Sequence, residues 1–280
     1  MTLASEASTE SVALTPQASV AAGLDQASRL QRTGNLVDAA AELEKAMVTA
    51  RATPYEIEFQ TRIRLGMTLA DVYLALDKNQ EARDMLAAEV AFAEKISQIM
   101  QATGTPPQKR AAMSGYLQIR DRSTQIALMG QTAPEITLKT WIKGGPVRLE
   151  DLRDRVVLLE FWATWCKPCQ EMFPKLKQLH EQATGRGLEI VAITRHYMAY
   201  GGTAEAKQEE LQLMDTTVTN HGVGFAVGVA DDESLQKTYG ANGLPTAILI
   251  DRRGVVRYAG PGGEDPGFEA MLWQCLDEAD

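Results

Sequence analysis

Two cysteines separated by two residues, Cys166 and Cys169, are the side chains in this sequence best suited to chemistry. Cys166 stands where an apolar segment, residues 156–162, gives way to a segment of helical periodicity, residues 167–180. At a helix N-terminus, backbone N–H groups and the helix dipole favour a thiolate, and Lys167 adds a positive charge nearby. We therefore expect Cys166 to attack disulfides as the nucleophile. Cys169, about one helical turn later, would then resolve the mixed disulfide.

A pair of cysteines at this spacing can also supply half of a zinc site, which needs two further ligands. The remaining candidates are Cys275, His180, His196 and His221, and none of them pairs with another at the spacing of metal ligands. A Cys-x-x-Cys pair close to a strand–helix–strand pattern is more typical of redox chemistry. We therefore expect no metal and no other cofactor.

The second half of the chain alternates between strand and helix patterns, which is typical of an α/β fold. Strands are expected at residues 135–138, 156–162, 188–193, 225–229, 246–250 and 255–258. Helices are expected at residues 167–180, 204–215, 233–239 and 268–276. The strand, helix and strand between residues 156 and 193 would form a right-handed parallel βαβ unit. Cys275 falls in the apolar stripe of the last helix, which indicates a small core residue.

The first half, residues 18–128, shows no convincing strand and is rich in the helix formers Ala, Leu, Glu, Gln and Arg. Turn signals near residues 34, 53, 78 and 105 divide it into about five helices. Two of the turns resemble tetratricopeptide repeats, but the interval from Ala39 to Ala82 is longer than the usual repeat of about 34 residues. A degenerate repeat with a concave surface for a partner and a helical bundle that stabilises or dimerises the protein are both consistent with this pattern.

Composition excludes several classes of protein. The net charge of −9, without a basic stripe, argues against a nucleic-acid partner. Three cysteines in 280 residues exclude a disulfide scaffold, and no apolar run reaches membrane-spanning length. Residues 1–17, rich in Ala, Ser, Thr and Glu, are expected to form a disordered tail without the features of a signal peptide. A linker near residues 129–134 would separate a helical domain, residues 18–130, from a second domain, residues 131–280.

The run F-W-A-T-W-C-K-P-C at residues 161–169, with Pro174 shortly after it, resembles the thioredoxin-fold thiol–disulfide oxidoreductases of the TlpA/ResA type. Further matches follow in the same order at Ala133–Pro134, Leu149–Leu152 and Gly243–Thr246. The resemblance is confined to the second half of the chain. It implies a thioredoxin-like α/β fold, a central mixed sheet flanked by helices, here preceded by an all-α helical-hairpin domain. It also implies activity as a protein-disulfide oxidoreductase.

The resemblance assigns roles to residues around the cysteines. Leu244–Pro245 is expected to be a cis peptide facing the pair, with the backbone of Leu244 offered to a substrate strand. Glu160 matches the buried acid of thioredoxin, whose raised pKa would let it take the proton of the resolving thiol. Trp165 would present a flat apolar surface to partner proteins. Pro168 would stiffen the turn that opens the helix.

One position departs from the family pattern. TlpA/ResA-type proteins often carry a Glu three residues after the second cysteine, where this chain has Met172, preceded by Glu171. The departure shifts the expected proton handling to Glu160. His196, at the end of a core strand, could tune a thiol, contact a substrate or be a plain surface residue.

The resemblance further implies protein disulfides or dithiols as substrates and a membrane-linked electron donor. It places the protein outside the cytoplasm, in the periplasm or secreted. Self-association or partner binding through the helical domain is also expected.

Other functions stay open at this point. A thiol-dependent peroxidase would need Thr or Ser three residues before its reactive cysteine, where this chain has Ala163. A helical-repeat adaptor would use its second domain only to sense redox state. A copper chaperone of related fold would have three residues between its cysteines instead of two.

Overall fold

The computed structural model describes residues 14–278, except for residues 200 and 264. The chain divides into two compact units, Met1–Tyr116 and Leu117–Asp280. Of the expected disordered tail, residues 1–13 lie outside the described residues, whereas Pro16 and Gln17 already belong to the first helix. None of the described helices is both long enough and apolar enough to cross a membrane.

Helices make up all of the regular structure between residues 14 and 128, as the composition predicts. They are α1 (Pro16–Arg32), α2 (Leu36–Ala52), α3 (Phe59–Ala75), α4 (Asn79–Thr103) and α5 (Pro106–Leu128). Side chains cap two of their starts, since Thr15 accepts from the amide of Ala18 and Asn35 from the amide of Asp38. The predicted breaks between helices are confirmed. The likeness to tetratricopeptide repeats stays a prediction.

The helical unit buries an ion pair between neighbouring helices. Arg62 Nε of α3 lies 2.7 Å from Glu89 Oε2 of α4, and their side chains are only 5% and 3% exposed. The Arg62 guanidinium also lies 3.5 Å from the centre of the Phe92 ring. Arg51 Nε of α2 reaches the other oxygen of Glu89 at 3.0 Å. Removing one member of such a pair would leave a buried charge uncompensated.

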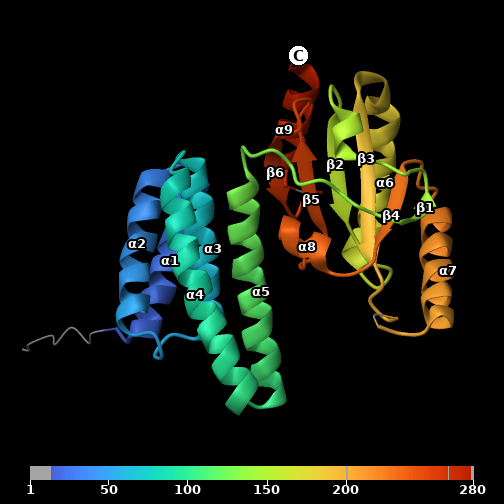
Figure 1. The fold of residues 1–280 in the computed structure, drawn as a ribbon. Coiled ribbons are helices and arrows are strands. Elements are labelled where there is room, and N and C mark those ends of the chain that lie inside the picture. Colours follow the sequence, from blue (N-terminus) through green and yellow to red (C-terminus); the bar gives the residue numbers. More distant parts are fainter. Residues whose placement is uncertain (1–13, 200, 264, 279–280) are drawn as a thin grey trace, which may run out of the picture. The chain divides into compact units, whose positions relative to one another are not determined.

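The described residues of the second unit form one six-stranded sheet in the order β1-β4-β3-β2-β5-β6 (Figure 1). Its strands are β1 (Thr140–Lys143), β2 (Val156–Phe161), β3 (Leu188–Arg195), β4 (Ala226–Ala230), β5 (Thr246–Ile250) and β6 (Val256–Gly260). β2, β3 and β4 pair in parallel, whereas β1, β5 and β6 join the sheet antiparallel. The sheet is therefore mixed. Apolar side chains are buried on both of its faces, which explains the near-continuous apolar runs of the central strands.

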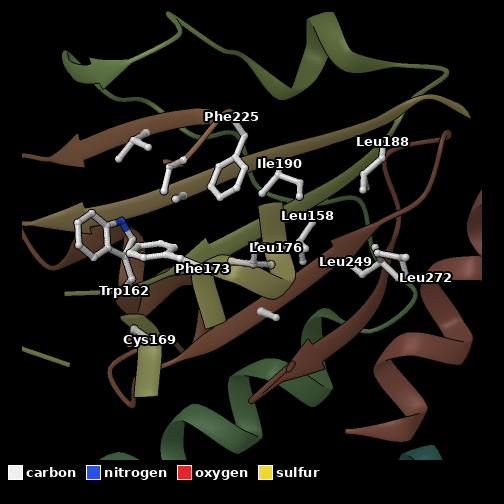
Figure 2. Packing of buried hydrophobic residues seen from close by; sticks show 14 of the residues in the cluster. Leu158, Trp162, Cys169, Phe173, Leu176, Leu188, Ile190, Phe225, Leu249 and Leu272 are labelled. Carbon is white, nitrogen blue, oxygen red and sulfur yellow. The ribbon is translucent and has the colours of Figure 1, made fainter. Parts of the chain in front are cut away.

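Two apolar layers enclose the sheet. On one face, helices α6 (Lys167–Ala183) and α9 (Pro266–Asp277) cover the sheet, with side chains of α7 (Ala204–Asn220) in the same cluster. Figure 2 shows Phe173 and Leu176 of this layer against Leu158 and Ile190 of the sheet. The opposite face packs against α8 (Ser234–Tyr239) and the end of α5.

The strand expected at residues 135–138 is wrong. The first strand of the sheet is β1, which starts at Thr140 and pairs with β4. The carboxylate of Glu135 instead accepts the amides of Ile136, Leu149 and Glu150, at 2.9, 2.7 and 3.0 Å. This segment thus bonds to the start of the 3₁₀ helix η1 (Leu149–Leu152) through a side chain. The alternating pattern still places Ile136 in the core, with 2% of its surface exposed.

Candidate active site

The two cysteines predicted to do chemistry are joined by a disulfide bond at the start of α6. Cys166 is the N-cap of the helix, with extended backbone, and its Sγ lies 3.3 Å from the amide nitrogen of Cys169. The expected position at a helix N-terminus is therefore confirmed. Cys166 is 4% exposed and Cys169 1% exposed, so both residues are buried, and both belong to the apolar cluster on the α6 side of the sheet. The amide that points at Cys166 would stabilise a thiolate there after reduction.

Lys167 would stabilise a thiolate at Cys166 less than its position next to this cysteine in the sequence suggests. Its side chain is 86% exposed, and its Nζ lies 3.5 Å from Glu171 Oε1 one turn further along α6. Water and this counter-charge both screen the ammonium, and exposed pairs of this kind are worth about 0.2–1 kcal/mol. The helix terminus is therefore the larger influence on Cys166.

Glu160 is a buried acid in the middle of the sheet. It lies on β2 opposite Ala192 of β3 and Ala247 of β5, and it is 1% exposed. Because side chains alternate along a strand, Glu160 faces the same side as Leu158 and Trp162, which is the side covered by α6. Neither carboxylate oxygen has a hydrogen-bond partner among the described residues. Burial raises the pKa of Glu160 well above its ordinary value of 4.5.

The loop between α8 and β5 carries the peptide bond Leu244–Pro245, which is cis. Leu244 packs against the apolar cluster that contains both cysteines. Pro245 is half-buried, and the adjacent Thr246 donates its hydroxyl to the carbonyl of Gly243 at 2.6 Å. The loop therefore reaches the same layer of the unit as the disulfide.

Trp165 provides an exposed apolar surface directly before Cys166, with 59% of its area accessible. Its ring meets that of Tyr197 edge-on, with centroids 5.3 Å apart and an angle of 90° between the ring planes. The guanidinium of Arg195 lies 4.1 Å from the centre of the Tyr197 ring. Met198, 63% exposed, follows Tyr197 in the chain. The loop after β3 thus contacts the aromatic side chain that precedes Cys166.

His196 pairs with an acid of the following helix. Its Nδ1 lies 3.0 Å from Glu210 Oε2 of α7, and the histidine is 8% exposed. Burial raises the pKa of Glu210, but backbone hydrogen bonds from Met198, Ala199 and Tyr197, together with the bond from His196, outweigh this effect and hold the pKa below its ordinary value. His196 therefore ties the loop after β3 to α7.

Sequence reasoning missed Glu210. The signal was present, because Glu210 occupies the apolar stripe that continues at i+4 and i+8 with the buried Met214 and Val218. A charged residue in such a stripe needs buried partners, and the three amides and the imidazole described above supply them.

The other candidates for a metal site do not come together. Among residues 14–278, apart from the two undescribed positions, no three His, Cys, Asp or Glu side chains are placed to hold a metal ion. His180 contacts Phe225, and His221 contacts Phe173. Cys275 is buried in α9, where burial raises the pKa of its thiol to about 11, as expected for a core residue.

Comparison with known proteins gives the family. Residues 129–259 match the model of the AhpC/TSA family. Over 142 residues, 51% of this chain and 74% of the relative, the sequence is 31% identical to the thiol-disulfide oxidoreductase ResA of Geobacillus kaustophilus. The chain belongs to the ResA-type thiol–disulfide oxidoreductases.

The chain is also similar to a second ResA and to a solved structure. ResA of Bacillus anthracis is 31% identical over 128 residues, which are 46% of this chain and 66% of that protein. Among solved structures, a thiol-disulfide isomerase from Corynebacterium glutamicum aligns with 52% of this chain and 98% of its own, at 24% identity and a TM-score of 0.44. The matched region thus spans 66% to 74% of the length of these two ResA relatives.

In this ResA-type chain the departure after the second cysteine has a visible consequence. Met172 occupies the expected Glu position and packs, half-buried, against the apolar cluster. Glu171 is 64% exposed and faces Lys167. Neither residue therefore presents a carboxylate to the buried side of the cysteine pair, whereas Glu160 lies on that side.

Proposed function

We propose that this chain is a thiol–disulfide oxidoreductase that exchanges two electrons with partner proteins through Cys166 and Cys169. The observation that carries the proposal is the disulfide formed at the N-terminus of α6, with Cys166 as the capping residue. Family membership supports the same reaction class. A helix terminus that favours a thiolate suits the attacking sulfur of such a reaction.

The reaction begins with the reduced pair. The Cys166 thiolate attacks one sulfur of a substrate disulfide, which breaks that bond and releases the other sulfur as a thiolate that takes up a proton. Cys169 then loses its proton and attacks Cys166, so the Cys166–Cys169 disulfide forms and the substrate leaves as a dithiol. The substrate gains two electrons and the cysteine pair loses two. The reverse sequence oxidises a partner dithiol.

Glu160 is the proposed acceptor for the proton of Cys169. Its raised pKa makes its carboxylate a stronger base than an ordinary glutamate, and it faces the side of the sheet on which α6 lies. A proton acceptor of this strength is better matched to a thiol than an exposed carboxylate would be. Protonation of Glu160 also removes a buried charge that has no partner among the described residues.

Trp165, Leu244 and Pro245 are the proposed substrate-binding residues. Trp165 offers an exposed apolar ring, and Leu244 packs against the apolar cluster that contains both cysteines. Lys167 and Pro168 are the proposed tuning residues at the start of α6: Pro168 stiffens the turn that carries Cys166, and Lys167 adds a weakly acting positive charge beside it. An extended segment around the disulfide of a partner protein would bind along Trp165, Leu244 and Pro245.

Cellular context follows from the resemblance to the family. We place the reaction outside the bacterial cytoplasm, in the periplasm or in the secreted fraction, with a membrane-linked protein as the source of electrons. The helical residues 18–130 would form a domain that binds a partner or a second copy of this chain.

Insulin reduction in the presence of a chemical reductant tests the proposal. The wild-type chain should accelerate the reaction, Cys166→Ser should abolish the acceleration, and Cys169→Ala should accumulate a mixed disulfide that mass spectrometry detects. Cys275→Ser is the matched control, because this free thiol is buried in α9 and its replacement should leave the rate unchanged.

Two results would contradict the proposal. Full activity in Cys166→Ser would show that Cys166 is not the nucleophile. Turnover of hydrogen peroxide faster than turnover of insulin would favour the thiol-dependent peroxidase instead, despite Ala163 at the position where that class needs a hydroxyl.

A further inference from the structure

A residue of helix α5 binds the loop that leads to the cis peptide. The carboxylate of Asp121 accepts the backbone amides of Asn242 and Gly243, at 3.0 and 3.2 Å, and the side-chain amide of Asn242 at 2.9 Å. Arg120 Nη2 also lies 3.2 Å from this carboxylate. Asp121 itself is 6% exposed, whereas Asn242 is half-buried and Gly243 is exposed, so the acceptor of these bonds is buried and the loop it binds lies at the surface. The residue lies outside residues 129–259, which match the family model.

The same helix also binds the beginning of this loop. Gln125, one turn after Asp121, donates its Nε2 to the carbonyl of Gly240 at 2.7 Å and is 7% exposed. Gly240 has a φ of +62°, and a Cβ at this position would lie 2.4 Å from the carbonyl oxygen of Asp121. The loop therefore runs against the backbone of α5. Two buried side chains of one helix fix residues 240–243 immediately before Leu244 and Pro245.

We infer that Asp121 is a positioning residue for substrate binding: it fixes the backbone that presents Leu244 to a bound polypeptide. The inference rests on the proposed function, in which a substrate segment lies along Leu244 and Pro245. Hydrogen bonds between two main chains depend on the alignment of their amides and carbonyls. A carboxylate that accepts two successive amides of the loop sets the orientation of the next peptide unit.

Asp121 acts on binding through the loop and not on the reacting sulfurs. Its partners are Arg120, Asn242 and Gly243, whereas the sulfur of Cys166 is contacted by the amide of Cys169. Loss of Asp121 should therefore weaken the binding of a polypeptide disulfide more than the attack on a small disulfide that needs no main-chain pairing. The ionisation of Cys166 should stay the same.

Steady-state kinetics of the full chain test this inference with two substrates, insulin and 5,5′-dithiobis(2-nitrobenzoic acid). In Asp121→Ala, the KM for insulin should rise about tenfold while kcat changes little. Small misplacements of positioning groups have effects of this order or larger. The ratio of kcat/KM for insulin to that for the small disulfide should fall by a similar factor. Asp121→Asn retains an oxygen acceptor and should recover part of the loss. The alkylation pH profile of Cys166 should match that of the wild type.

Asp251→Asn is the control for a general loss of stability. Asp251 is also buried, at 4% exposure, and its carboxylate also accepts two loop amides, those of Arg253 and Val255, at 3.0 and 2.9 Å. It lies just after β5, at the end opposite to Pro245. This variant should lose stability while keeping the wild-type ratio of the two substrates.

The outcomes separate the possible explanations. An equal loss on both substrates in the Asp121 variants, no loss on either, or the same selective loss in Asp251→Asn overturns the positioning role. If Asp121→Ala does not fold, Asp121→Asn decides by the same ratio. A wild-type chain that reduces neither substrate overturns the proposed function, and the inference with it.

Discussion

Replacement of Glu160 by glutamine tests the buried acid most directly, because it removes the ionisable group and keeps the shape of the side chain. In the folded protein the pKa of Glu160 lies well above 4.5, since burial penalises the carboxylate. Between 4.5 and this raised value, the folded chain binds one proton more than the unfolded chain. The contribution of Glu160 to the free energy of unfolding is therefore fully present below its ordinary pKa and is lost as the pH rises through the raised pKa.

The magnitude follows from the exchange of a single proton. The free energy of unfolding of the wild type should lose about 1.4 kcal/mol per pH unit from this group across the window. Glu160→Gln lacks the titration, so its stability minus that of the wild type should increase with pH at this slope and level off above the raised pKa. The same variant should resolve the mixed disulfide about 100-fold more slowly. This factor is the lower end of the rate loss expected when a general base is removed.

Urea unfolding from pH 4 to pH 9, with the disulfide intact, measures the stability difference, and stopped-flow mixing with a preformed mixed disulfide measures the rate. Glu171→Gln is the matched control, because it removes an exposed carboxylate from the start of α6 and should change the stability by at most about 1 kcal/mol and leave the rate unchanged. A stability difference between Glu160→Gln and the wild type that stays constant over this pH range would refute the buried acid. A normal rate of resolution would refute its role as the proton acceptor.

Three further predictions concern other buried groups. Glu210→Gln should destabilise the protein by about 1.5–3 kcal/mol near neutral pH, and this loss should disappear as the pH falls through the lowered pKa of Glu210, as urea unfolding at several pH values would show. Glu89→Gln leaves the buried Arg62 without its main counter-charge and should cost about 3–5 kcal/mol by the same assay, whereas the double variant Arg62→Met, Glu89→Leu should recover most of it. The thiol of Cys275, whose pKa is raised to about 11, should stay unlabelled when iodoacetamide at pH 8 modifies reduced Cys166, and equal labelling by mass spectrometry would contradict its burial.

The central elements of the fold follow from local patterns. The strands at β2, β3 and β5 were predicted to within two residues, because a strand buried on both faces has to be a short apolar run. The start of α6 followed from the change of periodicity at Cys166. The burial of Glu160, which the resemblance to thioredoxin implies, also agrees with the apolar neighbours on both sides of it in β2. Each of these features depends on residues that are close in the chain.

The errors and omissions depend on distant partners. The segment at residues 135–138 alternates like a strand, but Glu135 bonds the amide of Leu149 instead of leaving its neighbours to a sheet. Glu210 received no role because its three amide partners lie in the loop after β3. Asp121 and Asn242 are 121 positions apart in the sequence. Periodicity within one segment carries no information about such pairs.

The path of helix α5 bears on how the redox part of this chain should be isolated. A fragment cut at residue 129, where the match to the family model starts, would keep every strand of the sheet but lose both Asp121 and Gln125. It would then expose two main-chain amides and a carbonyl that these side chains bind in the intact chain. A fragment beginning before residue 117 retains the last turns of the helix, and with them the two side chains that bind the loop before the cis proline.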